Sequence, residues 1–181
     1  GFGRVPTTPP GGLTADDRTF LISHAYEMPS GRVPLHLLGW GVPLDDKTPG
    51  QPGAADRAPH AMVQEYLNRS EDSLWAMVSN GRPLRLLRDS STLIGQSYVE
   101  FDLESMFDGE VFSDFVVLYL VCHASRFEPD LRDDSTLADC WLERWRTYAA
   151  ETGTRALQAL SPGVKQAIEA LGTGFLSPPA N

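Results

Sequence analysis

The chain has 181 residues, enough for one compact domain, alone or with a helical extension, and too few for two large domains. Hydrophobic residues make up 41% of it and charged residues 22%, which is typical of a folded protein and excludes general disorder. The net charge of -9 is opposite to the basic surface with which proteins neutralise many phosphates, so it argues against tight, autonomous binding of nucleic acid.

The first 58 residues predict two short strands separated by irregular segments. Residues 1–17 are rich in Gly, Pro and Thr and predict an irregular arm. Residues 19–23 and 33–38 have the pattern of strands, and Pro34 places the second of them at the start or the edge of a sheet. Residues 39–58 contain several prolines and glycines without periodicity, which predicts a long mobile loop.

Residues 59–68 form the first predicted helix. Pro59 suits the first helical position, where the missing N–H removes no hydrogen bond. The apolar residues recur on one side of this helix, and that side is expected to press against a sheet. They are Met62, Val63, Tyr66 and Leu67.

Two apolar runs that follow the helix predict a β-hairpin. Residues 74–79 and 83–88 flank Asn80-Gly81, a pair that can supply the two positive φ angles of a type I′ turn. Residues 97–102 predict one more strand. The fold class expected for this part is therefore α/β, with a small mixed sheet of about four to five strands and one or two packed helices.

The apolar spacing changes to the helical period after Asp102. Helices are predicted at residues 110–125, 137–151 and 155–172. The predicted organisation is an irregular arm (1–17), an α/β domain (18–105) and a helical subdomain (106–181). Whether the last two are separate domains or share one core stays open at this point.

The two cysteines and the apolar runs bear on the compartment. Cys122 and Cys140 belong to no Cys-x-x-Cys pair, and both lie in apolar helical patterns, so we expect reduced thiols and a cytoplasmic protein. The longest apolar run, Phe115–Cys122, is far shorter than the roughly 20 residues of a membrane span. The sequence therefore predicts no membrane association.

Residues 59–68, 74–89 and 98–107 together resemble the N-terminal region of restriction-modification and phage-defence adenine-specific DNA methyltransferases. That group includes single-chain type II enzymes that fuse a nuclease to a methyltransferase, and the methyltransferases of DISARM-like systems. The resemblance covers most of the chain and is strongest in residues 59–128 and 140–181.

The resemblance implies an accessory domain of such a methyltransferase. Its role would be to scaffold the catalytic domain, to contact DNA through the parent protein, or to dock another subunit of the defence system. The chain begins at Gly1 without a Met and stops just after an apolar helix, and we expect it to be an N-terminal fragment of a longer protein. It contains neither a Gly-rich loop for S-adenosylmethionine nor an Asn-Pro-Pro-Tyr motif, so the resemblance places cofactor and methyl transfer elsewhere in the parent.

The fused relatives carry a nuclease of the PD-(D/E)xK type in this region, so the resemblance implies a nuclease-like core. The equivalent strand, residues 33–41, contains no Glu and no Lys, and Mg²⁺ requires hard oxygen ligands. We therefore expect a degenerate active site and no metal site. Asp45, Asp46 and Lys47 are the candidates for a displaced Mg²⁺-dependent endonuclease site, and a solvated acidic turn is the simpler interpretation of these residues.

A few other residues are candidates for contact with DNA. Gln64 lies on the helix that carries a DNA- or site-contacting Gln in many PD-(D/E)xK folds. Arg82, Arg85 and Arg88 cluster on the hairpin, although alternation along a strand points Arg85 away from the other two. Solvated charges are the simpler interpretation of these arginines.

His36 and an acidic run are the remaining candidates. His36 on an apolar strand is either a metal ligand or base, or, as is more common, a histidine satisfied within the core. Glu104 and Asp108 fit helix N-terminal turns, and Glu100 and Asp102 fit one face of a half-solvated strand. For the acidic run as a whole, these structural positions are a stronger interpretation than a metal site formed by its members. They are Glu100, Asp102, Glu104, Asp108, Glu110 and Asp114. An interaction module that stands alone, without a methyltransferase, is the third functional alternative.

Overall fold

The computed structural model describes residues 8–89, 98–129 and 135–176. Its contacts divide the chain into two compact units, Gly1–Leu142 and Glu143–Asn181. The sequence places the change from strands to helices near residue 105, close to where the first helix after the sheet begins, whereas the two units divide almost 40 residues later.

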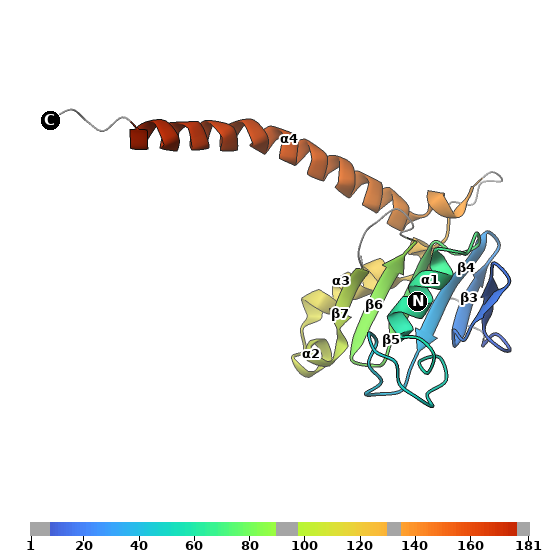
Figure 1. The fold of residues 1–181 in the computed structure, drawn as a ribbon. Coiled ribbons are helices and arrows are strands. Elements are labelled where there is room, and N and C mark those ends of the chain that lie inside the picture. Colours follow the sequence, from blue (N-terminus) through green and yellow to red (C-terminus); the bar gives the residue numbers. More distant parts are fainter. Residues whose placement is uncertain (1–7, 90–97, 130–134, 177–181) are drawn as a thin grey trace. The chain divides into compact units, whose positions relative to one another are not determined.

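The first unit is built on a five-stranded mixed sheet, in the order β3-β4-β5-β6-β7 (Figure 1). Strand β4 pairs parallel with β5, and the other neighbours are antiparallel. The strands are β3 (His24–Met28), β4 (Gly31–Leu37), β5 (Trp75–Ser79), β6 (Pro83–Arg88) and β7 (Tyr98–Asp102). The predicted α/β class with a small mixed sheet is confirmed, and β3 is a strand that the sequence analysis missed.

A two-stranded ribbon precedes the sheet. Strand β1 (Leu13–Ala15) pairs antiparallel with β2 (Arg18–Phe20), so the predicted irregular arm holds a strand in its last residues. Asp16 and Asp17 join the two strands with φ angles of 47° and 56°. Two positive φ angles in a two-residue connection are the signature of a type I′ turn.

The predicted hairpin β5-β6 is present, but its predicted type I′ turn is wrong. Ser79 pairs with Leu84, so residues 80–83 lie between the paired strands, and of these Gly81 alone has a positive φ, 88°. The Asn80 side chain closes the turn instead, because its Oδ1 accepts from the Arg82 amide at 3.0 Å. Asn80 prefers this local hydrogen bond to the left-handed backbone that the I′ turn would require.

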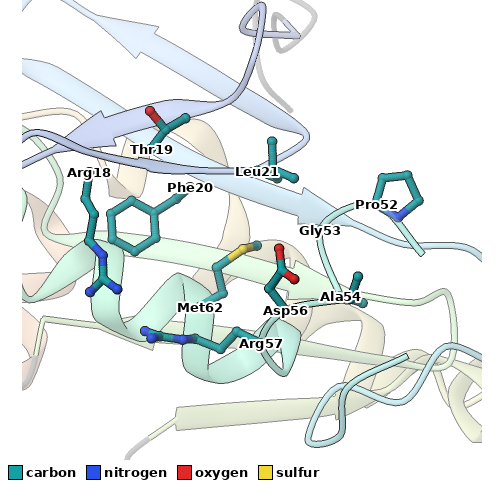
Figure 2. A pocket seen from close by; sticks show the side chains of 11 residues that line it. Arg18, Thr19, Phe20, Leu21, Pro52, Gly53, Ala54, Asp56, Arg57 and Met62 are labelled. Carbon is teal, nitrogen blue, oxygen red and sulfur yellow. The ribbon is translucent and has the colours of Figure 1, made fainter. Parts of the chain in front are cut away.

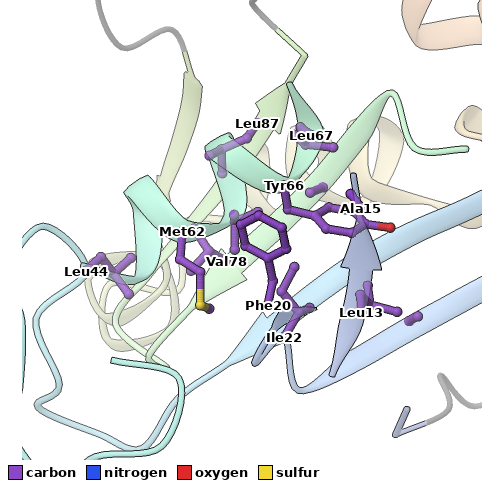
Figure 3. Close-up of a cluster of buried hydrophobic side chains, with 13 residues drawn as sticks. Leu13, Ala15, Phe20, Ile22, Leu44, Met62, Tyr66, Leu67, Val78 and Leu87 are labelled. Atoms are coloured by element: carbon purple, nitrogen blue, oxygen red, sulfur yellow. The ribbon is translucent and has the colours of Figure 1, made fainter. Parts of the chain in front are cut away.

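Helix α1 (Pro59–Leu67) covers one face of the sheet, as its apolar side predicts (Figure 1). Tyr66 is fully buried, and its ring meets that of Phe20 edge-on at 5.6 Å between centroids. This core joins the ribbon, the helix and the sheet (Figure 3). Its main members are Leu13, Phe20, Ile22, Leu44, Met62, Val63, Tyr66, Leu67, Val78 and Leu87.

The opposite face of the sheet packs against the segment that follows β7. That segment contains α2 (Leu103–Asp108), α3 (Phe112–Cys122) and the short 3-10 turns η1 (Ala124–Arg126) and η2 (Leu137–Asp139). Phe127, Cys140 and Leu142 are buried there against strand residues such as Met77 and Leu86. The predicted helix 110–125 is thus two elements, α3 and then η1. His123 caps the N-terminus of η1, because its side chain accepts from the Ser125 amide.

The second unit consists of helix α4 (Trp141–Leu176), which begins at the end of the first unit. The sequence predicted two helices here, 137–151 and 155–172, and that division is wrong. Glu151 and Arg155 pair at 3.1 Å across the predicted break, an i,i+4 contact that supports continuous helix. The helix also continues through Pro162.

Candidate functional site

A cleft of about 400 Å³ lies where the loop after β4 meets strands β6 and β7. It brings together several residues that the sequence analysis singled out from separate parts of the chain. Those residues are Asp45, Asp46, Arg82, Arg85, Glu100, Asp102 and Glu104. Several of the residues proposed from the sequence for metal binding or contact with DNA therefore meet in this cleft.

Arg85 is the centre of this site. It lies on β6 and is only 7% exposed. Its Nη1 and Nη2 donate to Oδ1 and Oδ2 of Asp45 at 2.6 and 2.8 Å, and its Nε donates to Oε2 of Glu100 at 2.6 Å. A fork of this kind is the strong, bidentate form of an arginine-carboxylate contact. It lowers the pKa of Asp45 and raises that of Arg85.

His60 and Tyr98 complete the surroundings of the guanidinium. The Nη1 of Arg85 lies 3.2 Å from Nδ1 of His60, and the Arg85 Cζ lies 4.5 Å from the centre of the Tyr98 ring. Burial, and secondarily the charge of Arg85, lower the pKa of His60. The neutral imidazole accepts at Nδ1, so its proton is on Nε2, which is buried and has no hydrogen-bond partner among the described residues.

The contacts of Arg85 make this geometry a clamp. We call Arg85, Asp45, Glu100, His60 and Tyr98 the Arg85 clamp; it fastens the loop after β4 onto the sheet. Both carboxylate oxygens of Asp45 already accept from Arg85. Within the described ranges, no three His, Cys, Asp or Glu side chains are grouped so as to hold a metal ion.

The other nuclease candidates are not brought into this clamp. Asp46 is exposed and lines the cleft, while Lys47 is exposed and does not line it. Asp45 and Asp46 of the predicted displaced site thus line the same cleft, and Lys47 does not. Asp45 holds the loop, Asp46 faces the cleft and Lys47 points to no partner recorded in the described part of the chain.

The candidates for DNA contact are also dispersed. Gln64 donates from Nε2 to the Arg88 carbonyl at 2.9 Å and ties α1 to β6. Arg82 is exposed, pairs with Glu104 and lies 5.5 Å from the Trp40 ring centre, whereas Arg88 donates from Nη1 to the Asp89 carbonyl at 2.6 Å. With Arg85 buried, the three arginines of the hairpin do not form one basic surface.

His36 and the acidic run take structural positions. His36 is 1% exposed, and its Nε2 lies 3.0 Å from the Gly53 carbonyl, while Nδ1 accepts from the Ser23 amide at 3.3 Å. Asp102 caps α2, because its Oδ1 accepts from the Ser105 amide at 3.0 Å. His36 is therefore satisfied in the core, and it pins the same loop at a second point.

Sequence reasoning missed His60 and Tyr98 as members of the site. A His after Pro59 at a helix start and a Tyr at a strand start carry no motif. Their spacing from candidates already named was the signal that could have found them. His60 is four residues before Gln64 and so shares its helix face, and Tyr98 is two residues before Glu100 and so shares its strand face.

A comparison of the chain with known protein families, with curated proteins and with solved structures found no match. Among the described residues, no helix is both long enough and apolar enough to cross a membrane. Neither Cys122 nor Cys140 forms a disulfide, and burial raises the pKa of the Cys122 thiol to about 12. At neutral pH this thiol is protonated and is a poor nucleophile.

The buried histidines predict that stability falls on mild acidification. The pKa of His36 and that of His60 are lowered mainly by burial, below the value of about 6.5 that an unfolded chain gives. The unfolded chain therefore binds more protons than the folded chain below this pH. The stability that the two neutral histidines contribute to the folded state is complete above about pH 6.5 and is lost as the pH falls. The loss of unfolding free energy between pH 6.5 and 5.5 is expected to reach at most about 1 kcal/mol per histidine.

Thermal unfolding of the chain and of His60→Gln from pH 7.5 to 5 measures this effect. His60→Gln is expected to flatten the dependence of the unfolding temperature on pH, whatever its effect at pH 7.5. His24→Gln is the control, because the His24 side chain is only partly buried, whereas His60 is 1% exposed. Equal slopes in all three proteins would contradict the prediction.

Proposed function

We propose that this chain is the N-terminal accessory domain of a restriction-modification or phage-defence adenine-specific DNA methyltransferase. In this proposal it carries out no catalysis and docks the catalytic part of the parent protein, which binds S-adenosylmethionine and DNA. The observation that carries the docking role is helix α3, which has no buried residue although it is mostly apolar. A helix that is apolar all round normally lies in a protein interior.

The exposed apolar side chains around α3 form what we call the α3 patch. Phe112 is 73% exposed and Phe107, on α2, is 61% exposed. The patch consists of Phe107, Val111, Phe112, Phe115, Val116, Val117, Tyr119 and Leu120. Exposed apolar areas of this kind mark surfaces that bind another protein or domain.

The charge around the α3 patch supports a protein partner over direct contact with DNA. Asp108, Glu110 and Asp114 are exposed beside it, and Arg126 lies at its edge, where its Nε donates to the Leu120 carbonyl at 3.0 Å. The three acidic side chains outnumber this one arginine. Phosphates would be repelled by such a rim. A DNA methyltransferase domain presents basic surfaces, so its apolar areas flanked by Lys and Arg would complement an acidic rim. DNA would then be reached through the parent protein, and other defence-system subunits through the assembled enzyme.

An active Mg²⁺-dependent endonuclease is less well supported. It would need Asp45, Asp46 and Lys47 to act together, and Asp45 is held by Arg85. If this site cleaved DNA, Asp46→Ala would abolish Mg²⁺-dependent cleavage; cleavage that survives the change would exclude the site. A stand-alone interaction module is supported by the same α3 patch. It differs from the first proposal in that no methyltransferase would be encoded together with the chain.

The reading frame downstream of Asn181 tests the methyltransferase proposal. A Gly-rich loop for S-adenosylmethionine followed by an Asn-Pro-Pro-Tyr motif is the expected result. A stop codon close to Asn181 would overturn the proposal and leave the stand-alone module as the better account.

The double variant Phe112→Ser/Phe115→Ser tests the docking role. Removing two phenylalanines from an interface is expected to weaken binding of the catalytic part by about a thousandfold, because each buried Phe contributes on the order of 2 kcal/mol and the two together about 4 kcal/mol. The unfolding temperature of the chain alone should stay unchanged, since both side chains are exposed. Binding is measured by calorimetry with the separately produced catalytic part.

Leu157→Ser/Leu160→Ser is the matched control for the docking test. These two α4 side chains are 71% and 63% exposed, so the same number of large apolar side chains is removed from another surface. Equal weakening in both double variants would show a general loss of hydrophobicity and would contradict a specific role of α3.

A further inference from the structure

We propose that the pocket between β2 and residues 52–57 binds a nucleoside monophosphate. This pocket lies on the α1 side of the sheet, apart from the Arg85 clamp and from the α3 patch, and the inference does not depend on the proposed function. Its volume is about 210 Å³, which is room for one flat ring system (Figure 2). We call it the Arg18 pocket.

The floor of the Arg18 pocket is apolar and rigid. Phe20 from β2 is 5% exposed and Met62 from α1 is 7% exposed, and both belong to the core of the first unit. Ala54, from the loop, is 1% exposed and lines the same pocket. An aromatic ring and a thioether that are already fixed by packing provide a preformed surface for a flat ring.

Two arginines stand at one end of the pocket. Figure 2 shows the guanidinium groups of Arg18 and Arg57 pointing toward one another from opposite sides. Both pair with the single carboxylate of Glu65, and the structure records no other ion pair for either guanidinium within the described residues. Arg69 also pairs with Glu65, at 3.2 Å, so three arginines share this one carboxylate in a protein whose net charge is -9.

This arrangement suits a phosphate better than a carboxylate. Arg18 is 52% exposed and Arg57 40% exposed, so their remaining N–H donors reach solvent at the pocket mouth. Each guanidinium has five N–H donors, and the Glu65 carboxylate accepts from only some of them. The donors that remain can bind a second acceptor group. A phosphate monoester has close to two charges and three terminal oxygens, and it can accept from both forks at once.

Asp56 defines the other end of the ligand. Its carboxylate lies on the far side of Met62 from the two guanidinium groups (Figure 2). A carboxylate accepts hydrogen bonds and does not donate them, so it selects a ligand with an N–H group at that end. A phosphate at the arginines, a flat ring over Phe20 and Met62, and an N–H at Asp56 are together the chemistry of a nucleotide.

Calorimetric titration of the full chain with deoxyadenosine monophosphate tests the proposal, with inorganic phosphate and deoxyadenosine as partial ligands. The nucleotide is expected to bind at least about tenfold more tightly than either part, because each part makes only half of the contacts. No binding of the nucleotide at millimolar concentration would overturn the proposal. Equal binding of phosphate and nucleotide would also overturn it, since the apolar floor would then have no role.

Two variants with opposite expected signs locate the site. Arg18→Gln/Arg57→Gln is expected to weaken nucleotide binding by at least about tenfold. Glu65→Gln is expected to tighten it by about threefold, because a competing negative charge is removed from both guanidinium groups. Weaker binding in Glu65→Gln without a change in unfolding temperature would contradict the assigned role of the two arginines.

Arg155→Gln is the matched control. Arg155 is an exposed arginine that pairs with one glutamate on α4, 3.1 Å from Glu151. This change removes one positive charge from a helix that contributes no residue to the pocket, so it should leave nucleotide binding unchanged. Loss of binding in this control would show that only the overall charge of the chain matters.

Discussion

Replacing Arg85 with leucine is expected to lower the free energy of unfolding by about 2–3 kcal/mol. The guanidinium is 8% exposed and neutralises two carboxylates, those of Asp45 and Glu100. Removing it leaves both carboxylates without their donor, and leaves Nδ1 of His60 without its hydrogen bond. The loss stays below the 3–5 kcal/mol of a fully buried pair, because the two carboxylates are 53% and 41% exposed and regain water.

Arg82→Leu is the matched control for this change. Arg82 lies three residues earlier, pairs with Glu104 and is 53% exposed. An exposed ion pair of this kind contributes at most about 1 kcal/mol. Urea unfolding of the two variants therefore separates a buried clamp from a surface charge. Equal losses would contradict the central place that we give to Arg85.

The Arg85 clamp also changes how the loop after β4 has to be described. The sequence predicted residues 39–58 to be mobile, because they are rich in Pro and Gly without periodicity. The structure pins this segment at several points, among them the contact of Asp45 with Arg85 and that of Gly53 with His36. Both pins join residues far apart along the chain, so local composition contains no signal for them.

Local patterns predicted the parts of the fold whose contacts are local. The stripe of α1 and the apolar runs of β5 and β6 were enough to place a helix and a hairpin. Strand β3 was missed because His24 and Glu27 interrupt its apolar residues, and its pairing with β4 is what makes it a strand. The type I′ turn was assigned to Asn80-Gly81 and occurs at Asp16-Asp17, since the side chain of Asn80 bonds locally.

Asp45, Arg85 and Glu100 could be singled out from the sequence as candidate site residues, but His60, Tyr98 and the geometry of the site could not. Strand alternation gave the opposite facing of Arg85 relative to Arg82, and the structure buries the first and exposes the second. The sequence did not show that Asp45 would reach Arg85, because the partners are 40 positions apart and a loop joins them. For the same reason, Asp45 was a metal-ligand candidate in the sequence and is a clamp residue in the fold.

Gly53→Ala is expected to lower the free energy of unfolding by about 3 kcal/mol. Gly53 has a φ of 76°, where an L side chain costs about 1–2 kcal/mol. A Cβ at this position would also lie 2.4 Å from Cε1 of His36 and 2.9 Å from the Leu21 carbonyl oxygen. His36 is buried and cannot move away freely, so its hydrogen bond to Gly53 would be lost along with the packing.

Gly50→Ala separates the steric part of this effect from the backbone part. Gly50 has nearly the same φ, 79°, in the same loop, and no atom lies within 4 Å of the position of its Cβ. Its alanine variant should lose only the backbone contribution, about 1 kcal/mol. The difference between the two variants in urea unfolding, about 2 kcal/mol, would then measure the contact of the loop with His36. If the two alanines cost the same, the loop is not held at Gly53, and the wall that residues 52–57 give to the Arg18 pocket would not be fixed.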